Sequence, residues 1–369
     1  MHIATILGTR PEIIRLSEII RLLDQHCQHS VVMTGQNFED ELSGLFFRDL
    51  DVRAPDLHLD VVETRFSVQL ARILEKTDAW LSEHRPDRLL LLGDTNSALS
   101  AVAAARRQIP VYHLEAGNRC YDDRVPEEIN RRIIDHCSTV LLPYTNRSKD
   151  NLLREGVSRD RIYVVGNPIY EVLKHHEGAI EESDVVGRLG LKKGNFFLVT
   201  VHRAENVDDA VRLEGIFEGL HRIAERFDLP VVVSVHPRTA RRLKELNIAS
   251  DERRIRLCKP FGFFDFVRLE RDARVVLTDS GTVQEECCIF GVPNLTLRDT
   301  TERPETIEVG SNVLAGTTPE GIERATALVM QLDSAWIPPP EYVTGGVTET
   351  VARIVLGLPG LARGAACES

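Results

Sequence analysis

Short runs of aliphatic and β-branched residues alternate along the chain with longer stretches in which apolar residues recur every three or four positions. The short runs predict buried strands, and the longer stretches predict amphipathic helices. In the first half of the chain, strands are expected at 2–7, 30–34, 88–92, 111–114, 139–142 and 161–165. Helices are expected between them at 11–23, 65–83, 97–108, 126–136 and 147–155. This alternation predicts a parallel sheet that is covered by helices on both faces.

The same alternation restarts after a polar stretch, 174–194, in which no hydrophobic period is clear. Further strands are expected at 196–201, 230–235, 256–258, 274–277 and 294–296, with helices that include 208–226 and 282–290. We therefore predict two doubly wound, Rossmann-like α/β domains, 1–170 and 171–347, joined by a linker near 170–195. The helical pattern near the C-terminus predicts a helix within about 348–369 that packs back on the first domain. Ligands of this fold bind at the carboxyl ends of the strands, so the predicted site is a cleft that the two domains face.

Composition narrows the classes of partner. The chain has 369 residues, with 45 Lys and Arg against 56 Asp and Glu, which gives a net charge of −11 at pH 7. This balance argues against a nucleic-acid or membrane-surface partner. No apolar run is long enough to cross a membrane, and the first residues are typical of a buried strand rather than a signal peptide. Seven scattered cysteines without a CxxC pair predict a reducing, cytoplasmic environment.

Polar residues directly follow six of the predicted strands. They are Gly8–Arg10, Gly93–Thr95, Glu115–Gly117, His202–Arg203, His236–Arg238 and Asp279–Gly281. Ordinary loop or capping roles could explain any one of these segments. The six together indicate a ligand site, because folding does not require polar residues at these positions.

The segment Ser280–Gly281–Thr282 lies between a predicted strand and a predicted helix. Small residues at the start of a helix let backbone N–H groups approach a phosphate closely. The acids Glu285 and Glu286 follow one turn later, where a carboxylate near a nucleotide commonly binds ribose hydroxyls. Simple helix capping remains the alternative for the serine and for the acids.

Basic side chains also gather at these strand ends. They are Arg10, Arg15, His202, Arg203, His236, Arg238 and Arg303. Opposed cations suit a diphosphate better than a neutral ligand. A surface ion pair is the alternative for Arg15 and Arg238, and a capped strand end is the alternative for the two histidines.

Carboxylates come from three elements of the first domain: Asp94, Glu115 and the pair Glu127–Glu128. Neighbouring buried carboxylates can serve as the acid and the base that move a proton at carbon. Capping of the next helix is the alternative for Asp94. No zinc-type spacing joins these acids to a histidine, so we expect no metal. The absence of GxSxG, Walker and GxGxxG motifs disfavours hydrolases, P-loop proteins and dinucleotide-dependent enzymes.

Eight motifs then occur in order: GTRPE (8–12), GDTNS (93–97), HLEAGNR (113–119), PEEINR (126–131), HRAEN (202–206), SVHPR (234–238), TDSGTVQEE (278–286) and RDTTERPE (298–305). Together they closely resemble the non-hydrolysing UDP-N-acetylglucosamine 2-epimerases, which share the two-domain fold of GT-B glycosyltransferases. The resemblance extends from residue 1 to about residue 358.

The resemblance implies a cofactor-free inversion at C2 of the sugar of a UDP-sugar. UDP is eliminated to leave 2-acetamidoglucal, and it then adds back with the proton delivered to the other face of C2. By position, the motifs assign catalytic roles to Asp94, Glu115, Glu127 and His202. They assign substrate binding to Arg10, Arg15, His236, Ser280, Gly281, Glu286 and Arg303. Relatives in this family are homodimers, so a homodimer is expected.

Three departures from the family pattern bear on the substrate. Thr282 replaces the second glycine that is usual in the phosphate turn, and TGQN (34–37) replaces the usual TGQH or TAQH. The segment 118–125 is short and charged, as in relatives that act on modified UDP-sugars such as intermediates toward UDP-N-acetyl-L-fucosamine. An epimerase of a modified UDP-sugar and a hydrolysing epimerase that releases N-acetylmannosamine are therefore the alternatives. A glycosyltransferase would need an acceptor site, and a non-catalytic UDP-sugar sensor would not need the acids.

Overall fold

The computed structural model describes residues 1–35, 46–63, 65–248, 253–332 and 335–358. The chain forms two compact units. The first comprises Met1–Lys174 and the chain from Glu341 onward, and the second comprises His175–Pro340.

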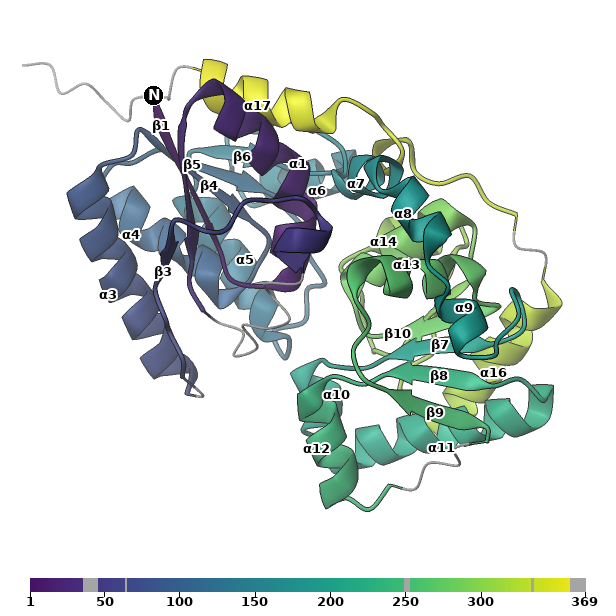
Figure 1. Cartoon of the computed structure of the whole chain (residues 1–369). Helices are drawn as coiled ribbons and strands as arrows, with labels where there is room; N and C mark the ends of the chain where they lie inside the picture. Colours follow the sequence, from purple (N-terminus) through teal and green to yellow (C-terminus); the bar gives the residue numbers. More distant parts are fainter. Residues whose placement is uncertain (36–45, 64, 249–252, 333–334, 359–369) are drawn as a thin grey trace, which may run out of the picture. The chain divides into compact units, whose positions relative to one another are not determined.

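The first unit contains a six-stranded parallel sheet with the strand order β3-β2-β1-β4-β5-β6 (Figure 1). Its strands are β1 (His2–Leu7), β2 (Gln28–Met33), β3 (Leu57–His58), β4 (Arg88–Leu92), β5 (Val111–Leu114) and β6 (Val140–Leu142). Its helices are α1 (Arg10–His26), α3 (Phe66–His84), η1 (Asn96–Ser100), α4 (Ala101–Arg106), α5 (Pro126–Cys137), α6 (Asn146–Arg154), η2 (Arg159–Arg161), α7 (Ile169–His175), η3 (Pro340–Tyr342) and α17 (Val347–Gly357). Because β1, β4 and β5 are parallel neighbours, their carboxyl ends lie at the same edge of the sheet.

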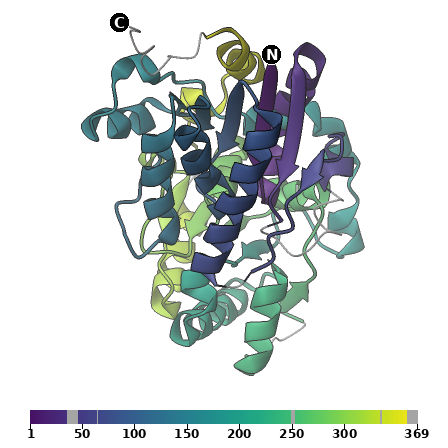
Figure 2. The same ribbon diagram turned by 90° about the vertical axis from the view of Figure 1, so that its left-hand side faces the viewer.

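Successive side chains of the buried strands pack on opposite faces of this sheet. Ala4 and Leu89 join the core formed with α3, α4 and α5, which lie along one face (Figures 1 and 2). Arg88 points the other way and donates a hydrogen bond to the Val355 carbonyl of α17. This period-two alternation with apolar residues on both faces is typical of a parallel sheet covered on both sides.

The second unit repeats the architecture with the strand order β12-β11-β10-β7-β8-β9. Its strands are β7 (Phe197–Thr200), β8 (Val231–Ser234), β9 (Ile255–Cys258), β10 (Val275–Thr278), β11 (Asn294–Thr296) and β12 (Asn312–Leu314). Its helices are α8 (Glu177–Glu182), α9 (Val185–Arg188), α10 (Ala204–Val207), α11 (Ala210–Phe227), α12 (Pro237–Glu245), α13 (Phe263–Asp272), α14 (Gly281–Phe290), α15 (Pro304–Glu308) and α16 (Pro319–Gln331). One core packs α11 and α16 on the sheet, and a second core packs α13 and α14 on its opposite face. The predicted fold class, two doubly wound α/β units, is confirmed.

The C-terminal helix α17 packs against α1 in the first unit (Figure 1). The Glu171 carboxylate fixes the start of α17, because it accepts hydrogen bonds from the N–H groups of Val347 and Thr348 at 2.8 and 2.9 Å and from the Thr348 hydroxyl at 2.6 Å. A carboxylate at this end also complements the helix dipole.

The structure corrects several predicted elements. The expected strand at 161–165 is wrong, because only Ile162 pairs with Leu141 of β6. The next step of that ladder would need an N–H from residue 143, which is proline. The expected linker near 170–195 contains two helices, α8 and α9, which pack against α13. The short strands β3 and β12 were not predicted, and residues 97–108 form η1 and α4 instead of one helix.

A glycine beside the predicted site generates a stability prediction. Gly117 has a φ of +78°, and a Cβ at this residue would lie 2.2 Å from the Ser148 carbonyl oxygen. Gly117→Ala should therefore lower the free energy of unfolding by about 2–5 kcal/mol, through backbone strain and a clash together. Gly156 has a similar φ of +83° but open space around it, so Gly156→Ala should cost only about 1–2 kcal/mol. Urea unfolding measures both values, and equal losses would contradict the predicted clash.

Candidate active site

The carboxyl ends of β1, β4 and β5 bring three of the predicted loops together. These strands are neighbours in the sheet and run parallel, so the loops Gly8–Arg10, Gly93–Thr95 and Glu115–Gly117 lie at the same edge. The order of the strands reverses between β1 and β4. Ligands of doubly wound sheets bind at such a reversal point.

Asp94 is held by the first turns of α5. Its carboxylate pairs with the buried Arg131 guanidinium at 2.5 Å, and the Asn130 side-chain amide donates to its backbone carbonyl at 3.0 Å. Thr95 occupies the N-cap position of η1, directly after Asp94. The buried guanidinium stabilises the negative charge of the aspartate. Sequence reasoning missed Arg131, although it lies within the PEEINR motif.

Glu115 forms a buried ion pair with Arg15. The Arg15 Nη1 donates to the Glu115 carboxylate at 2.7 Å, and the Asn118 side-chain amide donates to its other oxygen at 3.3 Å. Arg15 is only 2% exposed, and its guanidinium lies over the Tyr144 ring at 5.8 Å. The surface-pair alternative for Arg15 is therefore wrong. Glu115 also has a φ of +69°, an uncommon backbone conformation that aims its side chain from the end of β5.

The structure separates the roles of the two adjacent glutamates of α5. Glu128 is fully buried and accepts N–H groups from Cys120 and Tyr121 at 3.0 and 3.1 Å, and it pairs with Arg131 at 2.9 Å. Burial alone would raise the pKa of Glu128, but the Cys120 N–H and Arg131 hold it below its ordinary value. Glu128 therefore fixes the 118–125 loop. Glu127 lies partly buried in the same first helical turn and remains the candidate for proton transfer.

A buried polar network supports the loops that carry Asp94 and Glu115. The His113 ring donates from Nε2 to the Gly93 carbonyl at 2.8 Å, and its Nδ1 lies 2.8 Å from the Asp135 carboxylate. Asp135 also accepts the Gly117 N–H at 3.2 Å and pairs with Arg119 at 2.8 Å. Burial alone would raise the pKa of Asp135, but His113 and Arg119 hold it below its ordinary value. Both ring nitrogens of His113 therefore lie within hydrogen-bonding distance of a polar partner.

Glu12 joins the loops after β1 and β4. It completes a capping box with Thr9 at the start of α1 and accepts the N–H groups of Gly8 and Thr9 at 3.0 and 2.7 Å. Its other oxygen accepts the Thr95 hydroxyl at 3.0 Å. Burial raises the pKa of Glu12 to about 7, against the hydrogen bonds that lower it. Sequence reasoning missed Glu12, and the TxxE spacing at 9–12 is the signal that could have found it.

In the second unit, the equivalent edge is formed by β10, β7 and β8. Asp279 is fully buried there and accepts the backbone N–H groups of His202 and Arg203 at 3.0 and 2.9 Å. The His202 Nδ1 lies 3.2 Å from the same carboxylate, whereas its side chain is 41% exposed. Asp279 thereby fixes the orientation of the His202 ring through its Nδ1 atom. Sequence reasoning treated Asp279 only as part of a loop.

The phosphate-type turn lies at the start of α14. Ser280 is its N-cap residue, and its hydroxyl lies 2.9 Å from the Thr282 hydroxyl, so the threonine that replaces glycine bonds to the turn. Below the turn, the buried Arg303 pairs with Glu285. Arg303 also lies in van der Waals range of the position that a Gly281 Cβ would occupy, 3.5 Å away. Glu285 is therefore the partner of Arg303, and the capping-box alternative for Glu285 is wrong.

The remaining predicted residues lie at helix starts. His236 is the N-cap residue of α12, and its Nδ1 accepts the Arg238 N–H at 3.3 Å. Arg238 pairs with Asp208 at the surface, as the surface ion-pair alternative for this arginine predicted. The Arg10 guanidinium lies 5.7 Å from the Phe46 ring centre. Gln36 and Asn37 of the TGQN segment lie outside the described residues.

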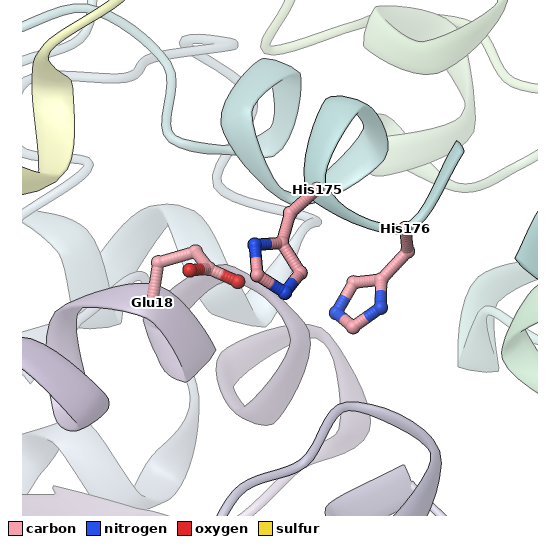
Figure 3. A group of neighbouring side chains, drawn as sticks. All are labelled: Glu18, His175 and His176. Carbon is pink, nitrogen blue, oxygen red and sulfur yellow. The ribbon is translucent and has the colours of Figure 1, made fainter. Parts of the chain in front are cut away.

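Figure 3 shows three side chains of types that bind metals: Glu18 on α1, and His175 and His176 at the end of α7. Glu18 belongs to the first unit, where it pairs with Arg21. The histidines belong to the second unit, where their rings pack edge to face with centroids 4.7 Å apart. His176 also packs on Phe264 at 5.4 Å. These contacts account for each side chain within its own unit.

Comparison with known proteins decides the family. The model of the UDP-N-acetylglucosamine 2-epimerase family matches residues 21–356. The chain belongs to this family. The UDP-N-acetylglucosamine 2-epimerase of Methanocaldococcus jannaschii is 39% identical over 363 residues, which cover 96% of this chain and 99% of that protein. Its crystal structure in complex with UDP-GlcNAc and UDP superposes with a TM-score of 0.91.

Two further members of the epimerase family illustrate its range. The structure of the UDP-N-acetylglucosamine 2-epimerase from Rickettsia bellii is 36% identical, covers 97% of this chain and 96% of its own, and gives a TM-score of 0.90. The UDP-2,3-diacetamido-2,3-dideoxy-D-glucuronate 2-epimerase of Pseudomonas aeruginosa is 36% identical over 86% of this chain and 88% of its own. Within the described part of this epimerase chain, none of the helices combines the length and the apolar character needed to cross a bilayer.

The buried network generates a second prediction. Asp135→Asn removes the charge that His113 and Arg119 share, so it should lower the free energy of unfolding by about 3–5 kcal/mol. Asp78→Asn makes the same chemical change in a surface pair with Arg107 and should cost at most about 1 kcal/mol. Urea unfolding of both variants measures the difference. A loss for Asp135→Asn as small as that of Asp78→Asn would contradict the structural role of the network.

Proposed function

We propose that this protein is a non-hydrolysing UDP-N-acetylglucosamine 2-epimerase that interconverts UDP-GlcNAc and UDP-ManNAc. The observation that carries the proposal is the pair of carboxylates, Asp94 and Glu115, at adjacent strand ends, each held in place by a buried arginine. Such carboxylates suit proton transfer at carbon. The names of the relatives with up to 39% identity support the same activity.

The proposed reaction begins with elimination. A carboxylate of the first unit removes the proton from C2, and the electron pair of that C–H bond forms the C1–C2 double bond. The bond between C1 and the diphosphate oxygen breaks, and UDP leaves with its electron pair. The intermediate is 2-acetamidoglucal. Asp94, Glu115 and Glu127 are the proposed acid and base groups, and their individual roles remain predictions.

The second step reverses the first, except that the proton returns to the other face of C2. The diphosphate oxygen of UDP adds to C1, and a carboxylic acid delivers a proton to the opposite face of C2. Because C2 is only weakly acidic, the reaction needs a leaving group whose charge is stabilised. We assign that stabilisation to Arg10, Arg15 and His202, and to the Ser280–Gly281 turn with the positive end of α14.

The remaining assignments concern the nucleotide. We assign the ribose hydroxyls to Glu286, and further nucleotide contacts to His236 and Arg303. Arg303 acts in this proposal from beneath the phosphate turn, where its pairing with Glu285 holds it. No cofactor or metal takes part in the proposed reaction.

We also propose that the protein is cytoplasmic and forms a homodimer. Sedimentation would detect the dimer at twice the 41.5 kDa chain mass.

A second candidate substrate is a modified UDP-sugar. The Pseudomonas aeruginosa relative, named for a diacetamido glucuronate sugar, is 36% identical to this chain. The charged loop 118–125, fixed here by Glu128, is the segment whose sequence resembles such relatives. The chemistry at C2 would be unchanged, whereas the contacts with the rest of the sugar would differ.

Product analysis tests the proposed function. Purified protein should convert UDP-GlcNAc into UDP-ManNAc in the presence of EDTA and without a nicotinamide cofactor, as resolved by ion-exchange chromatography. Free N-acetylmannosamine with UDP would instead indicate a hydrolysing enzyme. Turnover of a diacetamido UDP-sugar but not of UDP-GlcNAc would establish the second candidate.

Substitution of the carboxylates tests the catalytic assignment. Asp94→Asn and Glu115→Gln should each lower kcat by about 10²–10⁴-fold, because the amide cannot exchange the C2 proton. UDP binding, measured by calorimetry, should largely persist because neither carboxylate is among the groups proposed to bind UDP. Glu75→Gln, on the exposed face of α3, is the matched control and should leave kcat unchanged. Wild-type turnover by both site variants would refute the assignment.

A further inference from the structure

A second pair of carboxyl groups lies in the second unit, away from the strand-end loops. Glu270 on α13 is fully buried, and Glu286 on the adjacent α14 is 6% exposed. The two carboxyl groups lie close enough to share a hydrogen bond when one of them carries a proton. Apart from Glu286, neither carboxyl oxygen of Glu270 has a hydrogen-bond partner among the described residues. A buried acid without a cationic partner requires an explanation.

The pair can be buried only if it carries a proton. Two carboxylates in contact repel each other, and each loses its hydration on burial, so one proton is shared between them. Burial and the charge of Glu286 raise the pKa of Glu270 well above its ordinary value. The titratable group that faces both acids on α14 is the Cys287 thiol, whose pKa is also raised, by burial and by the same two acids. The raised pKa keeps the thiol neutral, so the shared proton belongs to the two carboxyl groups.

The proton belongs on Glu270. Glu270 is the more deeply buried member, and it lacks any donor besides Glu286 that could stabilise a carboxylate. Glu286 is 6% exposed, against 0% for Glu270, and lies less than two helical turns after the Ser280–Gly281 turn. A protonated Glu270 can donate to one oxygen of Glu286, which leaves the other oxygen as an acceptor.

We propose that Glu270 is a positioning residue for nucleotide binding: it holds the proton of the pair and orients the Glu286 carboxylate toward the ribose hydroxyls of the UDP-sugar. The inference rests on the proposed function, in which Glu286 binds the ribose. Loss of the shared proton would place two carboxylates side by side, turn Glu286 away from this orientation, and weaken UDP binding. The affinity for UDP should therefore fall as the pH rises and the pair loses its shared proton.

Calorimetric titration of the whole protein with UDP, from mildly acidic to mildly alkaline pH, tests the proposal. Glu270→Leu removes the donor and should weaken UDP binding about five- to tenfold at neutral pH. Glu270→Gln keeps a donor that cannot titrate, so it should bind UDP like the wild type at neutral pH and lack the alkaline step. Titration of UDP and of His202 affects the wild type and Glu270→Gln equally, so the difference between their pH profiles isolates the pair.

The outcomes separate this inference from the proposed function. If Glu286→Gln binds UDP as tightly as the wild type, the ribose-binding role of Glu286 is wrong. If Glu286→Gln weakens binding but the wild type and Glu270→Gln show the same pH profile, Glu270 is only a structural residue and the proposal is overturned. If Glu270→Leu fails to fold, the pH profile of Glu270→Gln alone decides. Tighter or equal binding by a folded Glu270→Leu would also overturn it.

Discussion

Buried charge at the strand ends is the constraint on which the first unit depends. A carboxylate withdrawn from water is costly unless a cation and hydrogen bonds compensate it. Asp94 and Glu115 meet this requirement through Arg131 and Arg15, which are themselves buried. The arginines therefore fix the positions of the acids before any substrate binds. Such preorganisation is what proton transfer at a weakly acidic carbon requires.

The supporting residues tie neighbouring strand ends to one another. Glu12 connects the loops after β1 and β4, and His113 connects the end of β4 to Asp135 on α5. The second unit repeats the strand order of the first and uses the same edge of its sheet. There Asp279 orients His202, as Arg15 and Arg131 orient the acids in the first unit. Each unit thus places its functional groups by burying a charged partner beneath them.

The sequence predicted the architecture because long hydrophobic patterns determine which elements form. The strands β1, β4, β5 and β11 were predicted to the residue, and motif resemblance identified the family. Local features were missed where one backbone atom decides the outcome, as at Pro143, which stops a ladder beside β6. The strand β3 pairs over two residues, which are too few to leave a hydrophobic pattern.

The candidate site was predictable in its residue types but not in its pairings. Nothing in the sequence indicates that Arg15 binds Glu115, because the two residues are 100 positions apart. The choice between Glu127 and Glu128 likewise depends on which side chain the 118–125 loop engages. Tertiary contacts between distant segments make these distinctions, and hydrophobic periodicity carries no information about them.

The central claim is that the protein exchanges the C2 proton of a UDP-sugar by elimination and re-addition. Proton NMR of the protein with UDP-GlcNAc in D₂O tests this claim most directly. The account predicts that deuterium replaces the C2 proton in both UDP-GlcNAc and UDP-ManNAc as the two epimers equilibrate. Formation of UDP-ManNAc that retains the original C2 proton would contradict it, because no carboxylate would then have exchanged that proton with solvent.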